Sequence, residues 1–310
     1  MKIDWNLLGD RLTSRYEKLI SLKSTRARVM CLCEMSLDWT DLEGAHTNSF
    51  KVFAEEFNRL QLSINLFENL LLEEELRHEH DGDDGFPIDM PRKLFRFPAM
   101  NDERGLAARS FGVEEQGRIE RVILDSRRSL KLRKDESIVR EIVHKLEFLS
   151  LFSFFEAFLE QLLGSEIWDG SEGSKKKANA TIMKKSLPEA FDLVLEEIKR
   201  PELRELVTSL NGTIFKTLHY AYLVRNVHTH NLGRITGYLI EKGLSYGSLV
   251  KHDLVDREGE VFRTDIVPDI EGLTSKALVQ GEYIGLSGLT RLLRGILLES
   301  AYILDAGSCK

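Results

Sequence analysis

The amino-acid sequence predicts a mainly α-helical protein with one small β-hairpin and an N-terminal helical extension. Only 6 of the 310 residues are proline, and apolar residues recur three or four positions apart over long stretches, as the buried face of a helix requires. Runs typical of β-strands are confined to one region near the C-terminus. The hydrophobic content of 42% is that of a globular protein and excludes a disordered chain.

Residues 1–135 are expected to form an N-terminal helical region, for which the sequence suggests no role. One helix is expected over Asn6–Ser36. A long amphipathic helix is predicted over Thr47–His78, where apolar side chains recur at helical spacing. The segment His78–Gly105 contains three prolines, several glycines and a dense acidic run, which predicts a large loop or a boundary. Helical character resumes near Glu114.

Residues 136–310 are expected to form a second helical domain. Its first helix, from Ser137 to Leu163, contains an apolar stretch of about membrane-span length, but three glutamates within that stretch indicate a buried core helix. The next segment, Gly164–Thr181, is rich in Gly, Ser and Lys and predicts a linker. Further predicted elements are helices over Pro188–Leu210, Thr213 to about His230, and Leu286–Leu304, with a hairpin near 248–267.

Composition and charge restrict the class of protein. No apolar signal segment follows Met1, and three cysteines fit no disulfide framework, so we expect a cytoplasmic protein without a membrane partner. The formal net charge of −7 argues against a generic polyanion binder, so any nucleic-acid role requires a local basic patch. Zinc-ligand spacing and phosphate-binding glycine loops are absent from the sequence, and no cofactor is predicted.

The most informative stretch ends the helix predicted from Thr213. Arg225 is followed directly by a polar residue, Asn226, and four residues separate Arg225 from His230. The helix then ends in His-Asn-Leu-Gly, and a bulky apolar helix, Leu149–Leu163, lies upstream. Together these features resemble the HEPN superfamily of helical ribonucleases, whose signature is an arginine, usually a polar residue, and a histidine after four to six residues.

The resemblance covers roughly Ser137 to the C-terminus and implies an HEPN-like helical bundle acting as a homodimer. In that family two protomers bring both arginines and both histidines to one cleft and cleave RNA without a metal. Carried over to this sequence, Arg225 and His230 are the catalytic pair, and Asn226 is the polar neighbour that orients it. The resemblance further implies a toxin or defence role, with an antitoxin protein as a further partner. Leu232 occupies the position of the tyrosine that is modified in several such toxins.

The chemistry of RNA cleavage suits these side chains. A 2′-hydroxyl attacks its adjacent phosphate when a base removes its proton, and histidine titrates closest to neutral pH, so His230 is the candidate base. The guanidinium of Arg225 suits the negative charge that develops on the phosphate oxygens. The expected products are a 2′,3′-cyclic phosphate and a 5′-hydroxyl, and DNA should survive.

Helix geometry sets a condition on this pair. Five positions along an α-helix turn through about 500°, so Arg225 and His230 lie about 140° apart and do not share a face. Fraying of the helix end at Asn231 and contribution from a second chain both relieve this separation. We favour a two-fold dimer in which each site borrows from its partner.

Other polar residues are candidates for supporting roles. His228 is expected to support the site or to be structural, and Glu156 is expected at the edge of the core or as a polar support for the site. Two basic clusters are candidates for binding the RNA backbone, although solvated helix faces and loops explain them equally well. The RNA-binding candidates drawn from these clusters are Lys175, Lys176, Lys177, Arg127 and Arg128.

Other interpretations remain or are set aside. Arg225 and His230 near a helix C-terminus also suit the helix dipole, which leaves open a non-catalytic HEPN-like interaction module. Gly243-Leu244-Ser245-Tyr246-Gly247 matches the hydrolase pattern G-x-S-x-G, but a helix is predicted before it and a strand after it, the reverse of the required order. The acidic segment around His78–Gly85 lacks the calcium-loop pattern and is expected to be a solvated loop.

Overall fold

The computed structural model describes residues 45–80, 96–97, 107–108, 113–130, 138–209, 213–256, 259–271, 273 and 277–308. The helix expected over Asn6–Ser36 lies outside these residues, as does most of the loop expected at His78–Gly105. The chain divides into two compact units. One is Ser63–His144, and the other combines Met1–Leu62 with Lys145–Lys310.

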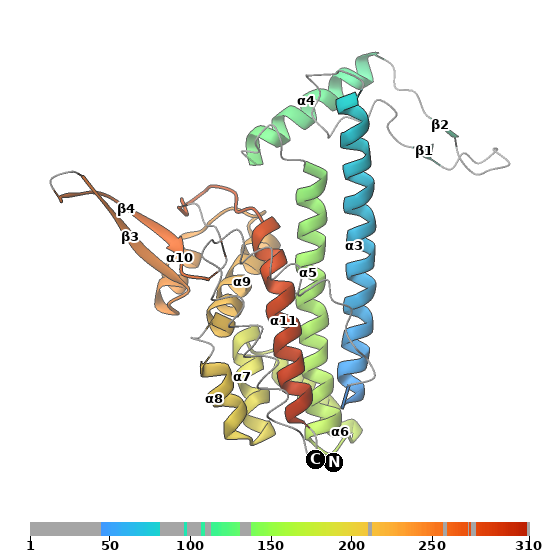
Figure 1. Cartoon of the computed structure of the whole chain (residues 1–310), viewed down its shortest axis with the longest axis vertical. Coiled ribbons are helices and arrows are strands. Elements are labelled where there is room, and N and C mark those ends of the chain that lie inside the picture. The colour runs from blue at the N-terminus through green and yellow to red at the C-terminus, as the bar shows by residue number, and fades with distance from the viewer. Residues whose placement is uncertain are drawn as a thin grey trace. The chain divides into compact units, whose positions relative to one another are not determined.

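The predicted mainly helical fold is confirmed for the described residues (Figure 1). The long helices expected near Thr47–His78, Ser137–Leu163, Thr213–His230 and Leu286–Leu304 are all present. The helices are α3 (Asn48–His80), α4 (Val113–Leu130), α5 (Ile138–Gln161), α6 (Glu172–Ile182), α7 (Leu187–Ile198), α8 (Pro201–Ser209), α9 (Thr213–His230), α10 (Gly237–Ser245) and α11 (Ser287–Gly307).

Two antiparallel strand pairs accompany these helices. In the unit Ser63–His144, the short strands β1 (Arg96–Phe97) and β2 (Ala107–Ala108) pair with each other. The predicted hairpin is confirmed as β3 (Leu249–Val255) and β4 (Val261–Pro268), which extend from the helices of their unit (Figure 1). A β-bulge interrupts the ladder after Leu254.

The linker expected over Gly164–Thr181 is wrong, because most of this segment is helical. A π-helix, η1 (Leu162–Ile167), follows α5, and α6 begins after Ser171, whose hydroxyl accepts a hydrogen bond from the Ser174 amide at 3.2 Å. A Cβ added at Gly164 would lie 3.0 Å from the Lys175 Cα, so this glycine permits the two helices to pack closely. Capping and packing therefore override a composition typical of linkers.

The single helix expected over Pro188–Leu210 is also wrong, because it is broken into α7 and α8. Lys199 adopts the left-handed conformation (φ 58°) and ends α7. Two residues later Pro201 begins α8, a position where its missing amide costs nothing.

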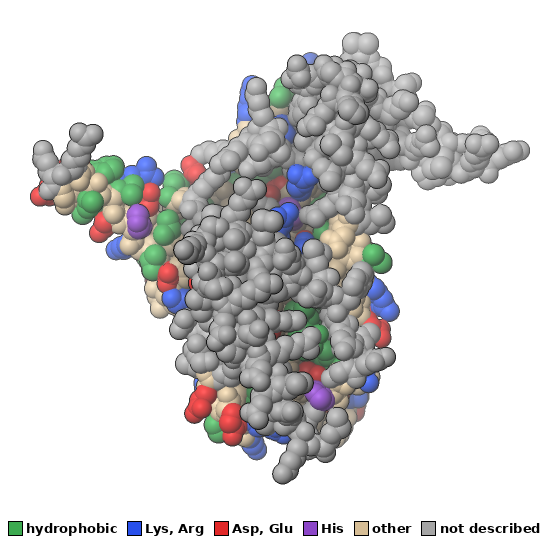
Figure 2. All heavy atoms as spheres, viewed as in Figure 1, with side chains coloured by type: hydrophobic (Ala, Val, Ile, Leu, Met, Phe, Trp, Pro, Cys, Tyr) green, Lys and Arg blue, Asp and Glu red, His purple; other side chains and the backbone are tan. Residues whose placement is uncertain are grey.

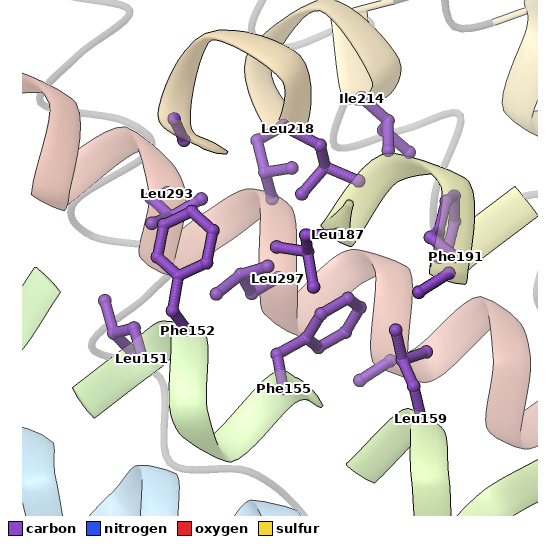
Figure 3. Close-up of a cluster of buried hydrophobic side chains, with 14 of the residues drawn as sticks. Leu151, Phe152, Phe155, Leu159, Leu187, Phe191, Ile214, Leu218, Leu293 and Leu297 are labelled. Carbon is purple, nitrogen blue, oxygen red and sulfur yellow. The ribbon is translucent and has the colours of Figure 1, made fainter. Parts of the chain in front are cut away.

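A core of phenylalanine and leucine side chains joins four helices of the larger unit (Figure 3). It includes the predicted buried helix α5, whose Phe152 and Phe155 are at most 1% exposed. The labelled side chains come from α5, α7, α9 and α11: Leu151, Phe152, Phe155, Leu159, Leu187, Phe191, Ile214, Leu218, Leu293 and Leu297. These contacts fix α9, which carries the candidate site, against the rest of the bundle.

The beginning of α3 belongs to the same core. Phe53 packs against Phe158 of α5 with ring centroids 5.1 Å apart, and Phe50 packs against Tyr302 of α11 at 4.9 Å. Two oxygens of the buried Asp305 accept hydrogen bonds from the Thr47 amide (2.8 Å) and the His46 amide (3.0 Å). The sequence predicted a division between residues 135 and 136, whereas the first turns of α3 pack within the unit that contains Lys145–Lys310.

A buried polar layer crosses the same three helices. Glu147 of α5 is fully buried, and Arg294 of α11 is 3% exposed. The Arg294 guanidinium donates to both carboxylate oxygens of Glu147, one of them from Nη2 at 2.7 Å, and Gln61 of α3 donates at 3.3 Å. Each buried charge is therefore paired. None of the described helices is long and apolar enough to span a membrane.

Candidate functional site

The end of α9 has a well-defined geometry. The Asn231 and Gly233 amides both donate to the Val227 carbonyl, at 2.9 and 3.1 Å, which closes the last turn of the helix. Leu232 (φ 52°) and Gly233 (φ 80°) are both left-handed. The predicted helix end at Asn231-Leu232-Gly233 is thus confirmed.

The helix end bears on one of the two ways of relieving the angular separation of Arg225 and His230, the fraying of α9. α9 remains helical through His230, so fraying does not bring the two side chains to one face. The separation of about 140° stands within one chain. Within one chain, the two side chains therefore leave α9 in different directions.

Arg225 lies beside a carboxyl group of α5. Its guanidinium is close enough to Glu156 to interact electrostatically, and both side chains are half-buried. Burial raises the pKa of Glu156 above its usual value, and the positive charge of Arg225 opposes that rise. The fold thus brings two of the sequence-predicted residues together, and Asn226, also half-buried, follows Arg225 in α9.

His230 is exposed in the last turn of α9. In the same turn the Thr229 hydroxyl donates to the Arg225 carbonyl at 2.8 Å, a contact that involves only the backbone of the arginine. The imidazole of His230 is thus accessible to solvent. Neither Arg225 nor His230 is buried within the core of its own chain.

His228 has a different environment. It is 2% exposed, its Nε2 lies 2.9 Å from the Ile284 carbonyl oxygen, and its ring meets Tyr283 edge-on at 5.4 Å. Burial lowers the pKa of His228 to about 4. This histidine therefore supports the end of α9 as a neutral buried side chain and does not reach solvent.

Gly233 completes this support. A Cβ at this position would lie 2.4 Å from the Tyr283 ring and 2.9 Å from His228 Cε1, and its positive φ disfavours other residues. The Ile284 amide donates to the Gly233 carbonyl at 2.9 Å, and the Ile235 amide donates to the Glu282 carbonyl at 2.8 Å. These contacts fix the segment before α11 against the end of α9.

The basic RNA-binding candidates lie in two different units. Lys175, Lys176 and Lys177 are exposed on α6. Lys177 lies over the Trp168 ring, 4.9 Å from its centroid, and Lys176 pairs with Glu172 at 3.5 Å. The remaining two, Arg127 and Arg128, lie in the last turn of α4, in the unit Ser63–His144.

Neither a hydrolase serine nor a metal site is supported by the described residues. Ser245, the serine of G-x-S-x-G, lies at the end of α10 before β3, and its hydroxyl donates to the Lys242 carbonyl at 2.9 Å. The hydroxyl is therefore engaged locally at the end of a helix. Within the described residues, no group of three or more His, Cys, Asp or Glu side chains is arranged to hold a metal ion.

The sequence did not predict one contact of a histidine on α9. His219 of α9 stacks on Tyr246 with ring centroids 4.3 Å apart. Burial lowers the pKa of His219, while the nearby carboxylate of Glu189 opposes that effect. His219 and Tyr246 lie 27 residues apart in the sequence, so no local sequence pattern predicts that their rings stack.

The chemical capacity of α9 follows from the side chains described. Arg225 offers a permanent cation beside a carboxyl group, and His230 offers an accessible imidazole. Comparisons of the chain with protein-family models, curated proteins and solved structures found no match.

Proposed function

We propose that this protein is a metal-independent endoribonuclease of the HEPN type that acts as a homodimer. The observation that carries the proposal is the presentation of Arg225 and His230 on α9: His230 is exposed, and Arg225 is half-buried and interacts electrostatically with Glu156. A toxin or defence role, controlled by an antitoxin, belongs to the same proposal through the family resemblance.

The active site is composite. Because α9 is helical through His230, one chain directs its arginine and its histidine about 140° apart. The two-fold symmetry of a homodimer allows the arginine of one chain to approach the histidine of the other. The accessibility of both residues is consistent with this arrangement, whereas burial of either would favour a purely structural pair.

In the reaction, the 2′-hydroxyl of RNA attacks the adjacent phosphorus, and the bond from phosphorus to the 5′-oxygen breaks. His230 of one chain accepts the 2′-hydroxyl proton, and the imidazolium of the other chain donates a proton to the leaving 5′-oxygen. Arg225 binds the non-bridging phosphate oxygens, on which negative charge develops. The products are a 2′,3′-cyclic phosphate and a 5′-hydroxyl.

Glu156 acts as a positioning residue in this proposal. Its partly buried carboxylate attracts the Arg225 guanidinium and restricts its orientation at the surface of α9. The exposed lysines of α6 supply positive charge for the RNA backbone outside the reacting phosphate. Glu156→Gln should therefore lower cleavage without abolishing it.

The decisive experiment is cleavage of a mixed single-stranded RNA in excess EDTA, with the product ends assayed. Wild-type protein should give cyclic-phosphate ends, while Arg225→Ala and His230→Ala should each lose roughly a hundredfold or more of the rate. The exposed residues Arg59 and His46 provide matched controls, and their alanine variants should cut like wild type.

Mixing the two inactive variants tests the composite site. A heterodimer of Arg225→Ala and His230→Ala chains contains one intact arginine and one intact histidine from different chains. The single histidine can act as the base while water protonates the leaving 5′-oxygen, so a small part of the activity should return. An inert wild-type protein, or catalytic variants that cut as fast as wild type, would refute the proposal and favour the non-catalytic interaction module.

A further inference from the structure

The hairpin β3–β4 carries an open strand edge. It is a two-stranded sheet, and among the described residues β3 pairs with β4 alone. Two-stranded hairpins are marginally stable in water, and unpaired strand edges favour the addition of another strand. Most of β3 is exposed, and Figure 2 shows hydrophobic, acidic and basic side chains together along the hairpin.

The hydrogen-bond pattern identifies which residues of β3 face outward. The Ile266 carbonyl of β4 accepts a bond from the Leu278 amide at 2.8 Å, so it points away from β3. Lys251 is the partner of Ile266, and its backbone groups therefore point away from β4. By alternation, the backbone groups of Lys251, Asp253 and Val255 form the open edge, whereas Leu249, at the start of β3, is buried.

The sequence of β3 is chemically symmetric about its central residue. It reads Leu-Val-Lys-His-Asp-Leu-Val, with His252 at the centre. Lys251 and Asp253 flank this histidine, and two apolar residues follow on either side. A strand with this pattern is complementary to an antiparallel copy of itself.

We propose that β3 pairs antiparallel with β3 of a second copy of this chain, about a two-fold axis at His252, to form a four-stranded sheet across a homodimer. In this register Lys251 lies opposite the partner's Asp253, and Asp253 lies opposite the partner's Lys251. Val250 lies opposite the partner's Leu254 in the same way. Opposite charges and apolar pairs in directly opposed positions stabilise antiparallel sheets.

Other registers lack this complementarity. A two-fold axis at Lys251 places the two lysines opposite each other, and an axis at Asp253 places the two aspartates opposite each other; both arrangements are unfavourable. An axis between residues pairs outward-facing backbone groups with inward-facing ones and forms no ladder. The axis at His252 also lies at the middle of β3 and opposes the stretch Val250–Leu254 to its own copy.

Charge reversal tests this register through sedimentation of the full chain over a range of concentrations. Wild type should dimerise reversibly. Lys251→Glu and Asp253→Lys each place two like-charged pairs in the dimer, and each should weaken dimerisation roughly tenfold or more. An equimolar mixture of these two variants should form a heterodimer, because every opposed pair is then of opposite sign.

The double variant Lys251→Glu/Asp253→Lys restores complementarity within one chain and should dimerise like wild type, which separates loss of pairing from loss of folding. Glu205→Lys, an exposed charge reversal on α8, should leave dimerisation unchanged. A monomeric wild type at every concentration would overturn the inference. So would single reversals that leave a wild-type dimer intact, or a mixture that remains monomeric.

The inference does not depend on ribonuclease activity, and its test uses no RNA. Arg225→Ala and His230→Ala should dimerise like wild type. A chain that pairs through β3 and cuts no RNA would refute the proposed function alone, whereas a chain that cuts RNA and ignores the charge reversals would refute the strand pairing alone.

Discussion

His228 makes the stability of the protein depend on pH in a defined range. Its Nε2 donates to the Ile284 carbonyl oxygen, because a carbonyl can only accept, so the neutral ring carries its proton on Nε2. Nδ1 is then the atom that must be protonated to form the cation. Nδ1 is buried and finds no hydrogen-bond partner among the described residues, so protonation would bury an unpaired charge.

The magnitude follows from the lowered pKa. The unfolded chain binds a proton at His228 near pH 6.5, whereas the folded chain does so near pH 4. The stability contributed by the neutral ring is therefore complete above pH 6.5 and is lost as the pH falls to about 4. The difference corresponds to about 3 kcal/mol, a large part of the stability of a typical domain.

Urea unfolding followed by circular dichroism between pH 4 and pH 8 measures this loss. His228→Gln keeps an amide donor for Ile284 but does not titrate, so wild type should lose about 3 kcal/mol more than this variant between pH 7 and pH 4. His46→Gln, at an exposed position, should follow wild type. Parallel pH curves for wild type and His228→Gln would refute the assignment of a buried neutral histidine.

Three further predictions concern stability and are measurable by the same unfolding assay. Leu232 is 81% exposed and left-handed, so Leu232→Gly should relieve backbone strain and stabilise the protein by about 1 kcal/mol; a lower stability would mean that the side chain makes a contact. Arg294→Met should lower the free energy of unfolding by about 3–5 kcal/mol, because Glu147 is left buried without its cation. Adding Glu147→Leu to this variant should recover most of that loss. Equal stability of the single and double variants would contradict the ion-pair explanation. Asp305→Ala should lower the free energy of unfolding by about 1–3 kcal/mol, because the Thr47 amide loses its acceptor. An unchanged midpoint of urea unfolding would show that another group replaces the carboxylate.

Most of the helices could be predicted from the sequence because their apolar residues recur at helical spacing. α6 was missed because its composition is that of a linker, and its helical state depends on the Ser171 cap and on close packing at Gly164. Pro201 could have predicted the break before α8, because proline favours the first turn of a helix. Nothing in the sequence predicts the left-handed conformation of Lys199, which ends α7. The packing of Phe50 and Phe53 on α5 and α11 was not predicted, because the spacing of apolar residues identifies a buried face but not the helix against which it packs.

The candidate site could also be predicted in part from the sequence. The positions of Arg225 and His230 on one helix, and hence their angular separation, follow from counting residues. The approach of Glu156 to Arg225 requires the packing of α5 and α9, which the sequence leaves open. The role of His228 depends on Ile284, a carbonyl 56 residues away, and side-chain chemistry alone does not reveal such a partner.

The buried pair of Glu147 and Arg294 also selects one alignment of its helices. Apolar residues recur along both α5 and α11 at helical intervals, so a shift of one of these helices against the other by a full turn, about 5.4 Å, would still bury an apolar face. The same shift would separate the guanidinium from the carboxylate and leave both charges in the core. Apolar contacts therefore favour packing of the helices against one another in several alignments. The polar layer of Glu147, Arg294 and Gln61 favours one of these alignments over the others. We expect the Glu147→Leu/Arg294→Met variant to remain stable but to give broadened or doubled amide resonances; a single sharp set would assign the choice of register to packing alone.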